Sequence, residues 1–124
     1  MPSAGGDLVD AMQPIVAAWK AQRADRQARR QLDPDDFAAL RQIGFLTCVV
    51  PEDLGGTWRD VATSARPVCE ALRRLATADP SVALVAAMHP SVVSFWLLNP
   101  HPEQPVWEQQ RRAVFASALA GEQW

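Results

Sequence analysis

The two histidines, His89 and His101, are the side chains best suited to acid–base chemistry near neutral pH. His101 lies in the proline-rich segment 99–105, which indicates an irregular loop without a chemical role. His89 ends an apolar helical stretch and precedes Pro90, a place where pockets are often formed. Two interpretations of His89 therefore stand: a core or capping histidine, which is the commoner case, and a histidine that faces a pocket.

The other reactive side chains lack the groupings that catalysis or metal binding requires. Cys48 and Cys69 are too far apart for a Cys-x-x-Cys motif, and histidine, cysteine and carboxylate side chains do not cluster in the sequence. Adjacent carboxylates such as Asp35 and Asp36 point in different directions, and helix capping explains them. The sequence predicts no catalytic residue and no metal site within this chain.

Size and composition limit the classes of protein that remain. A chain of 124 residues, 48% apolar, can bury one core, and a net charge of −2 gives no reason to expect nucleic acid as a partner. Two thiols without a secretory signal indicate a reducing compartment, so we expect a cytoplasmic protein. The longest apolar stretch, 82–98, is interrupted by His89 and Pro90 and is shorter than the roughly 20 residues of a membrane span.

Apolar residues at helical intervals predict the scaffold, an all-α, up-and-down bundle of four or five helices. The first helix is indicated by Leu8, Met12, Ile15 and Trp19. Its polar continuation, 20–30, is basic, and is either a surface for an anionic partner or, more commonly, a solvated helix face. Further helices are predicted for segments 34–43, 59–78, 80–98 and 106–112, and Gly44 is expected to close the first of these in a left-handed conformation. Segment 80–98 is apolar nearly all round and is expected to be central, with a kink or break at Pro90.

Two segments are predicted not to be helical. The apolar run 45–50 is too short for a helix and is expected to be a buried extended connector, followed by a tight turn at Gly55 and Gly56. Segment 114–120 is expected to form a short terminal β-segment. A strand in that position has no partner in the chain, which indicates a larger protein body beyond the bundle.

The order of several motifs resembles the N-terminal helical domain of the acyl-CoA dehydrogenase family over about residues 20–122. The matching motifs are Leu40-Arg41-Gln42-Ile43-Gly44-Phe45, Val50-Pro51-Glu52-Asp53-Leu54-Gly55-Gly56, Glu70-Ala71-Leu72, Leu75-Ala76, Asp79-Pro80-Ser81-Val82-Ala83 and then His89. The resemblance implies a helical domain over 1–112 and the beginning of a flavin-binding β-domain over 113–124.

The resemblance also implies a function and its site residues. The expected activity is FAD-dependent α,β-dehydrogenation of acyl-CoA thioesters in fatty acid metabolism, by a homotetramer that can pass electrons to an electron-transfer flavoprotein. Ala83, Ala87 and His89 would wall the substrate pocket, and Leu119 and Gly121 would contact the FAD. The fragment alone is expected to be inactive, since the family's catalytic base lies outside it.

Two alternatives remain. The family usually has Thr-Glu-Pro or Ser-Glu-Pro where this chain has Gly121-Glu122-Gln123. A flavin-dependent monooxygenase of the dibenzothiophene type, which shares the fold and carries a histidine on the corresponding helix, fits that departure. A non-catalytic helical interaction module is the other alternative, and it predicts a bundle without an unpaired strand.

Overall fold

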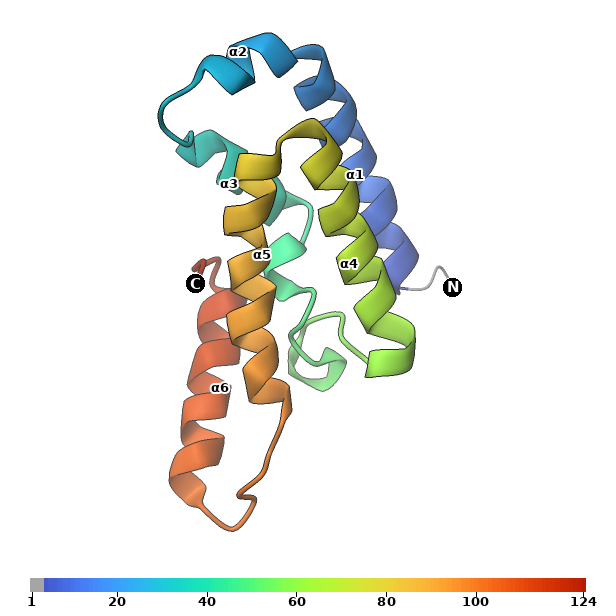
Figure 1. Ribbon diagram of the computed structural model, residues 1–124. Coiled ribbons are helices and arrows are strands. Elements are labelled where there is room, and N and C mark those ends of the chain that lie inside the picture. The colour runs from blue at the N-terminus through green and yellow to red at the C-terminus, as the bar shows by residue number, and fades with distance from the viewer. Residues whose placement is uncertain (1–3) are drawn as a thin grey trace.

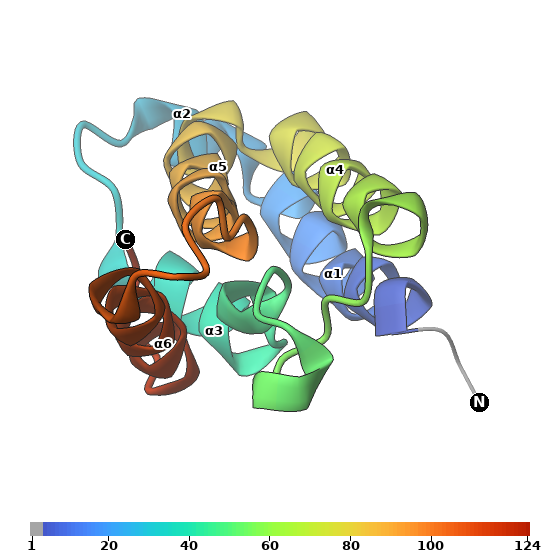
Figure 2. The same ribbon diagram turned by 90° about the horizontal axis from the view of Figure 1, so that it is seen from below.

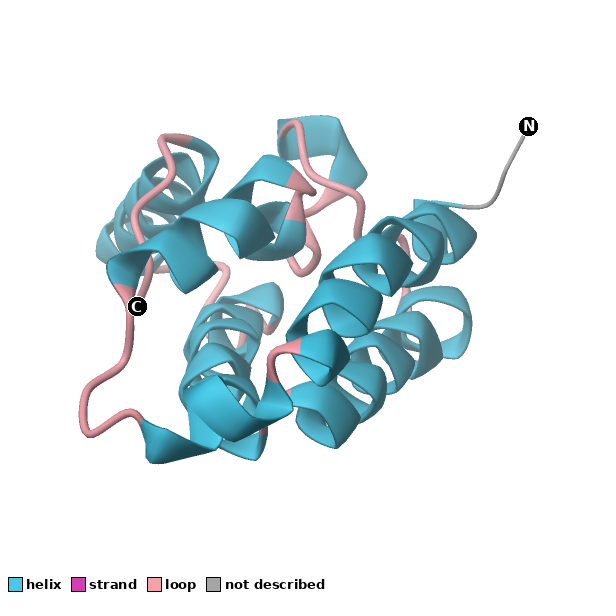
Figure 3. Cartoon of the chain, turned by 90° about the horizontal axis from the view of Figure 1, so that it is seen from above, coloured by secondary structure: helices cyan, strands magenta, loops and turns pink. Residues whose placement is uncertain are grey.

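Helices make up most of the chain (Figures 1 and 3). The structure is a computed structural model that describes the backbone of residues 4–124 and the side chains of residues 7–124. The α-helices are α1 (Ala4–Ala21), α2 (Arg23–Ala28), α3 (Pro34–Gln42), α4 (Val61–Ala78), α5 (Pro80–Ser94) and α6 (Pro105–Leu119). Short 3-10 turns lie at η1 (Phe45–Thr47), η2 (Glu52–Leu54) and η3 (Phe95–Leu97). The predicted all-α class is confirmed.

Aspartates fix where three of the helices begin. Asp33 accepts the backbone N–H of Asp35 at 2.9 Å, Asp60 that of Thr63 at 2.8 Å, and Asp79 that of Val82 at 3.0 Å. These bonds satisfy donors that a helix N-terminus leaves free. At the other end of α3, Gly44 has φ +85°, as its predicted closing role requires.

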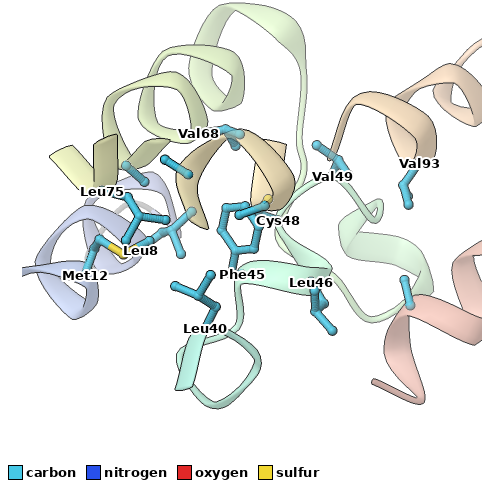
Figure 4. Packing of buried hydrophobic residues seen from close by; sticks show 14 of the residues in the cluster. Leu8, Met12, Leu40, Phe45, Leu46, Cys48, Val49, Val68, Leu75 and Val93 are labelled. Carbon is cyan, nitrogen blue, oxygen red and sulfur yellow. The ribbon is translucent and has the colours of Figure 1, made fainter. Parts of the chain in front are cut away.

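The helices pack as a bundle in which α4, α5 and α6 run up, down and up, with α1 beside α4 (Figures 1 and 2). The core is centred on the chain between α3 and α4. Phe45 and Val50 are inaccessible to solvent, and Figure 4 shows Phe45 among side chains of the surrounding elements. The burial predicted for 45–50 is correct, but the extended conformation is wrong, because η1 coils this segment.

The predicted terminal β-segment is wrong, because segment 114–119 is the end of α6. Its buried residues, Val114, Phe115 and Ala118, follow helical spacing. Gly121 closes α6 with φ +88°: its N–H donates to the Ala118 carbonyl, and the next N–H donates to the Ser117 carbonyl. This pair of bonds is a Schellman motif, in which glycine is the residue that adopts a positive φ without strain.

Because α6 occupies the segment predicted to be an unpaired strand, the inference of a larger protein body from that strand no longer holds. An end without an unpaired strand is what the interaction-module alternative expects. Assignment to a family therefore depends on the order of the motifs and not on a lone strand.

Helix α5 is buried on one face only, which corrects the expectation of a fully central helix. Val82, Ala86 and Val93 face the core, whereas Leu84 and Met88 are 72% and 58% exposed. Pro90 lies inside the helix and does not split it. The stretch Pro80–Leu97 is long and apolar enough to cross a membrane, but this is weak support for a span, since core helices of soluble bundles meet the same criterion.

Candidate functional site

His89 is completely buried on α5, and both of its ring nitrogens have partners. Nε2 lies 2.7 Å from the carbonyl oxygen of Leu46, and the backbone N–H of Trp124 donates to Nδ1 at 3.0 Å. A ring nitrogen that accepts a hydrogen bond carries no proton, so Nε2 carries the hydrogen and donates to Leu46. His89 is therefore a neutral imidazole that joins the chain between α3 and α4 to the segment after α6.

Burial lowers the pKa of His89 below its usual 6.5, and the hydrogen bond to Leu46 offsets this only in part. The unfolded chain therefore takes up a proton at a higher pH than the folded chain does. We expect the free energy of unfolding to fall as the pH drops from about 6.5 toward the pKa of His89 in the folded chain. Below that pKa, His89 should cause no further loss of stability. Urea unfolding between pH 7.5 and 5 measures this effect.

His89→Gln is the matched variant for that titration, because glutamine does not ionise. Its unfolding free energy should change less over the same range, whereas His101→Gln, at an exposed position, should keep the full dependence. A parent protein whose stability is flat across this range would contradict the expected effect of His89.

The other predicted site residues lie on α5 and at the end of α6. On α5, Ala83 is buried in the core and Ala87 is half-buried. Leu119 ends α6 and lies against the loop at Gly55. A Cβ atom added to Gly55 would be 3.5 Å from the Leu119 side chain. Gly121 lies beside the Arg41 side chain. Their roles toward substrate and cofactor stay predictions.

Residues 121–124, hereafter the tail, lie between α3 and α5 with a pocket on either side. One pocket, about 450 Å³, is mostly apolar and is lined by Leu32, Pro34, Phe37, Val85, Gln123 and Trp124. The other, about 320 Å³, is lined by Pro34, Asp35, Phe37, Ala38, Arg41, Leu46, Gly121 and Gln123. The two pockets share Pro34, Phe37 and Gln123 and therefore adjoin, and together they are called the trough below.

The backbone donors of the tail are largely used within the chain. The N–H groups of Gly121, Glu122 and Trp124 donate to Ala118, Ser117 and His89 in turn. A flavin contact through the N–H of Gly121 would break the helix-closing bond. The N–H groups of Gly121, Glu122 and Trp124 are therefore not free to bind a flavin in this conformation.

A buried ionic cluster is the feature that the sequence interpretation missed. Arg26 is 6% exposed and donates to both oxygens of Asp36, at 3.2 and 2.6 Å, and to Asp79 at 2.9 Å. Its guanidinium lies 3.9 Å from the centre of the Trp19 ring. Arg29 adds a further bond to Asp36.

The basic stretch is thus not one solvated face. Arg26 lies seven residues after Trp19 and so continues the helical spacing of the apolar residues of α1. This spacing is the sequence signal that indicates the burial of Arg26. The cluster joins α2, α3 and the start of α5 through buried hydrogen bonds.

Within residues 4–124 no group of three or more metal-ligating side chains gathers. Burial raises the pKa of the Cys48 thiol to about 12, so this thiol stays protonated and unreactive near neutral pH. Cys69 is exposed. The described side chains contain no arrangement that could carry out catalysis unaided.

Comparison with known proteins agrees with the resemblance. The family described as "Acyl-CoA dehydrogenase, N-terminal domain" matches residues 8–122. The chain is also similar to the amino sugar nitrososynthase DnmZ of Streptomyces peucetius, with 35% identity over 85 residues, or 68% of this chain. It spans only 20% of that relative's length. No solved structure matches. The chain therefore belongs to the acyl-CoA dehydrogenase family, of which it forms the N-terminal domain.

Proposed function

We propose that this domain walls one side of the substrate pocket in an FAD-dependent oxidoreductase of the family. The family match over residues 8–122 carries this proposal. The larger pocket beside the tail, to which Phe37 of α3 and Val85 of α5 contribute, is mostly apolar, as small-molecule sites usually are. Ala83, Ala87 and His89 lie on the helix that borders it.

An open apolar face supports a role beside another protein body. Leu84 and Met88 on α5 and Phe95 at the start of η3 are each more than half exposed. Large contiguous apolar patches are uncommon on soluble monomers and mark interaction surfaces. The chain spans a fifth of its relative's length, which fits packing against further domains. Homotetramer formation belongs to the same proposal.

The first candidate reaction is α,β-dehydrogenation of an acyl-CoA thioester. It rests on the family description, and the small side chains of Ala83 and Ala87 leave room for an acyl chain beside α5. Electron-transfer flavoprotein would then be the natural electron acceptor, in the cytoplasm. None of the residues in this chain is assigned the catalytic base.

A flavin-dependent monooxygenase is the second candidate, and two observations favour it. The relative DnmZ is named for forming a nitroso group on an amino sugar, a reaction that introduces an N–O bond. Gly121 and Gln123 stand where the dehydrogenases usually have a hydroxyl residue and a proline. The substrate would then be an amine or other oxidisable compound in place of a thioester.

The isolated chain is expected to be colourless and inactive. Because the tail's backbone donors are occupied and the described residues include no catalytic grouping, FAD should not co-purify and acyl-CoA should not turn over. Visible absorbance after dialysis against FAD measures the first, and acyl-CoA oxidation with a dye acceptor measures the second. Near-stoichiometric flavin on the chain would contradict the proposal.

Expression of the complete reading frame that encodes this chain separates the two reactions. Acyl-CoA-dependent bleaching of the flavin without oxygen supports dehydrogenation. Substrate-dependent oxygen uptake with reduced flavin supports oxygenation. A complete protein that binds no flavin would leave the helical interaction module as the remaining interpretation.

A further inference from the structure

Beyond the helix-closing bond of Gly121, three hydrogen bonds from Glu122 and Trp124 fasten the tail to the bundle. The backbone N–H of Trp124 donates to His89 Nδ1, and the indole Nε1–H of the same residue donates to Ser117 Oγ at 2.8 Å. The N–H of Glu122 donates to the Ser117 carbonyl at 3.0 Å. Two of these bonds are to α6, from which the tail emerges. Only the bond to His89 joins the tail to a different helix.

Residues of the tail form part of the lining of both pockets of the trough. Pro34, Phe37 and Gln123 line both pockets, so Gln123 stands where the two halves meet. Together the halves are within the size range of small-molecule sites, roughly 300–1,000 Å³. Leu46, whose carbonyl accepts the hydrogen bond from His89 Nε2, lines the smaller of the two pockets. The position of the tail therefore shapes both pockets.

We propose that His89 is a positioning residue that latches residues 121–124 across the trough between α3 and α5, and that release of this latch opens the trough. The occupant of the trough in the latched state is the tail itself. His89 acts through the backbone of Trp124, so the latch does not depend on the side chain at position 124. This inference does not require a flavin or either candidate reaction.

The geometry of the ring explains why histidine suits the position. Nε2–H anchors the ring to Leu46, which leaves Nδ1 aimed at the tail as an acceptor. An asparagine oxygen can stand near the place of Nδ1, whereas a glutamine amide can reach toward Leu46 as Nε2–H does. His89→Asn should therefore keep the acceptor for Trp124, and His89→Gln should lose it.

Amide hydrogen exchange in the 124-residue chain, followed by NMR, tests the latch. The Trp124 amide should exchange about five- to tenfold faster in His89→Gln, the change expected for one lost hydrogen bond. In His89→Asn it should stay near the parent rate. His101→Asn, at an exposed loop position, is the matched control and should change nothing. Equal rates in the parent and His89→Gln, or in the two His89 variants, overturn the proposal.

Two further measurements address folding and the trough. The histidine ¹⁵N spectrum of the unaltered protein should show His89 with the hydrogen on Nε2, and a hydrogen on Nδ1 overturns the latch whether or not the variants fold. A hydrophobic dye should bind His89→Gln more than the parent, while the buried Val50 amide, which donates to the Thr47 carbonyl at 3.1 Å, stays protected. Adding Val85→Lys, on the wall of the trough, should abolish the extra binding. Extra binding that persists overturns the opening of the trough.

Discussion

Arg26→Ala is expected to lower the free energy of unfolding by about 3–5 kcal/mol, the cost of breaking a buried ion pair from one side. The substitution removes three hydrogen bonds to Asp36 and Asp79 and the contact with Trp19. Asp36 keeps a bond from Arg29, and Asp79 keeps the N–H of Val82, but both carboxylates stay largely buried with less compensation. Since small domains are stable by about 5–15 kcal/mol, this is a large share.

Urea unfolding followed by circular dichroism measures the loss, with Arg30→Ala as the control. Arg30 is exposed on the same stretch, and its removal should change the stability by less than about 0.5 kcal/mol. The loss of unfolding free energy in Arg26→Lys should lie between the losses in Arg26→Ala and Arg30→Ala. A lysine ammonium keeps the charge but cannot reproduce the planar guanidinium that binds both aspartates. A loss in Arg26→Ala no larger than in Arg30→Ala would show that the cluster does not stabilise the fold.

Helix beginnings were predictable because their signals are local. Asp33 and Asp79 each precede a proline, and the structure places both as side-chain caps of the helices that follow. Gly44 was predicted to close α3 for the same reason. Such positions depend on a few neighbouring residues and need no knowledge of the packing around them.

The terminal segment was misread because short apolar runs do not distinguish strand from helix. Val114 and Phe115 with Ala118 fit a helical stripe, and Gly121 is a stop signal that was read only as a departure from a family motif. The extended connector at 45–50 failed similarly. For 45–50 the predicted burial is correct and only the predicted conformation is wrong.

His89 could be singled out from the sequence, but its contacts could not. Proximity of His89 to a kink-prone proline singled it out, yet its partners are 43 and 35 residues away in the chain. Arg26 and Asp79 are 53 residues apart. Hydrogen bonds over such separations depend on how whole helices pack, which composition and spacing do not encode.

Gly56→Ala is expected to destabilise the protein by about 2–4 kcal/mol, because the loop leaves no space for a Cβ atom. A Cβ at this position would lie 2.1 Å from the carbonyl oxygen of Val50 and 2.4 Å from its Cβ. That carbonyl accepts the N–H of Trp58 at 2.9 Å, and the N–H of Gly56 donates to Pro51 at 3.0 Å. Relief of the clash must therefore displace backbone and break hydrogen bonds that close the loop.

Gly55→Ala separates this steric effect from backbone strain. Gly55 has φ +102°, but a Cβ there would meet only the Leu119 side chain at an ordinary 3.5 Å. Its cost should be about 1–2 kcal/mol, the penalty for a left-handed conformation in a residue with a Cβ. Urea unfolding should rank Gly56→Ala as the more damaging, with Trp58 N–H exchange accelerated most in that variant. The reverse order would mean that the loop yields at Gly56, and that the Gly55-Gly56 pair serves conformation rather than close packing.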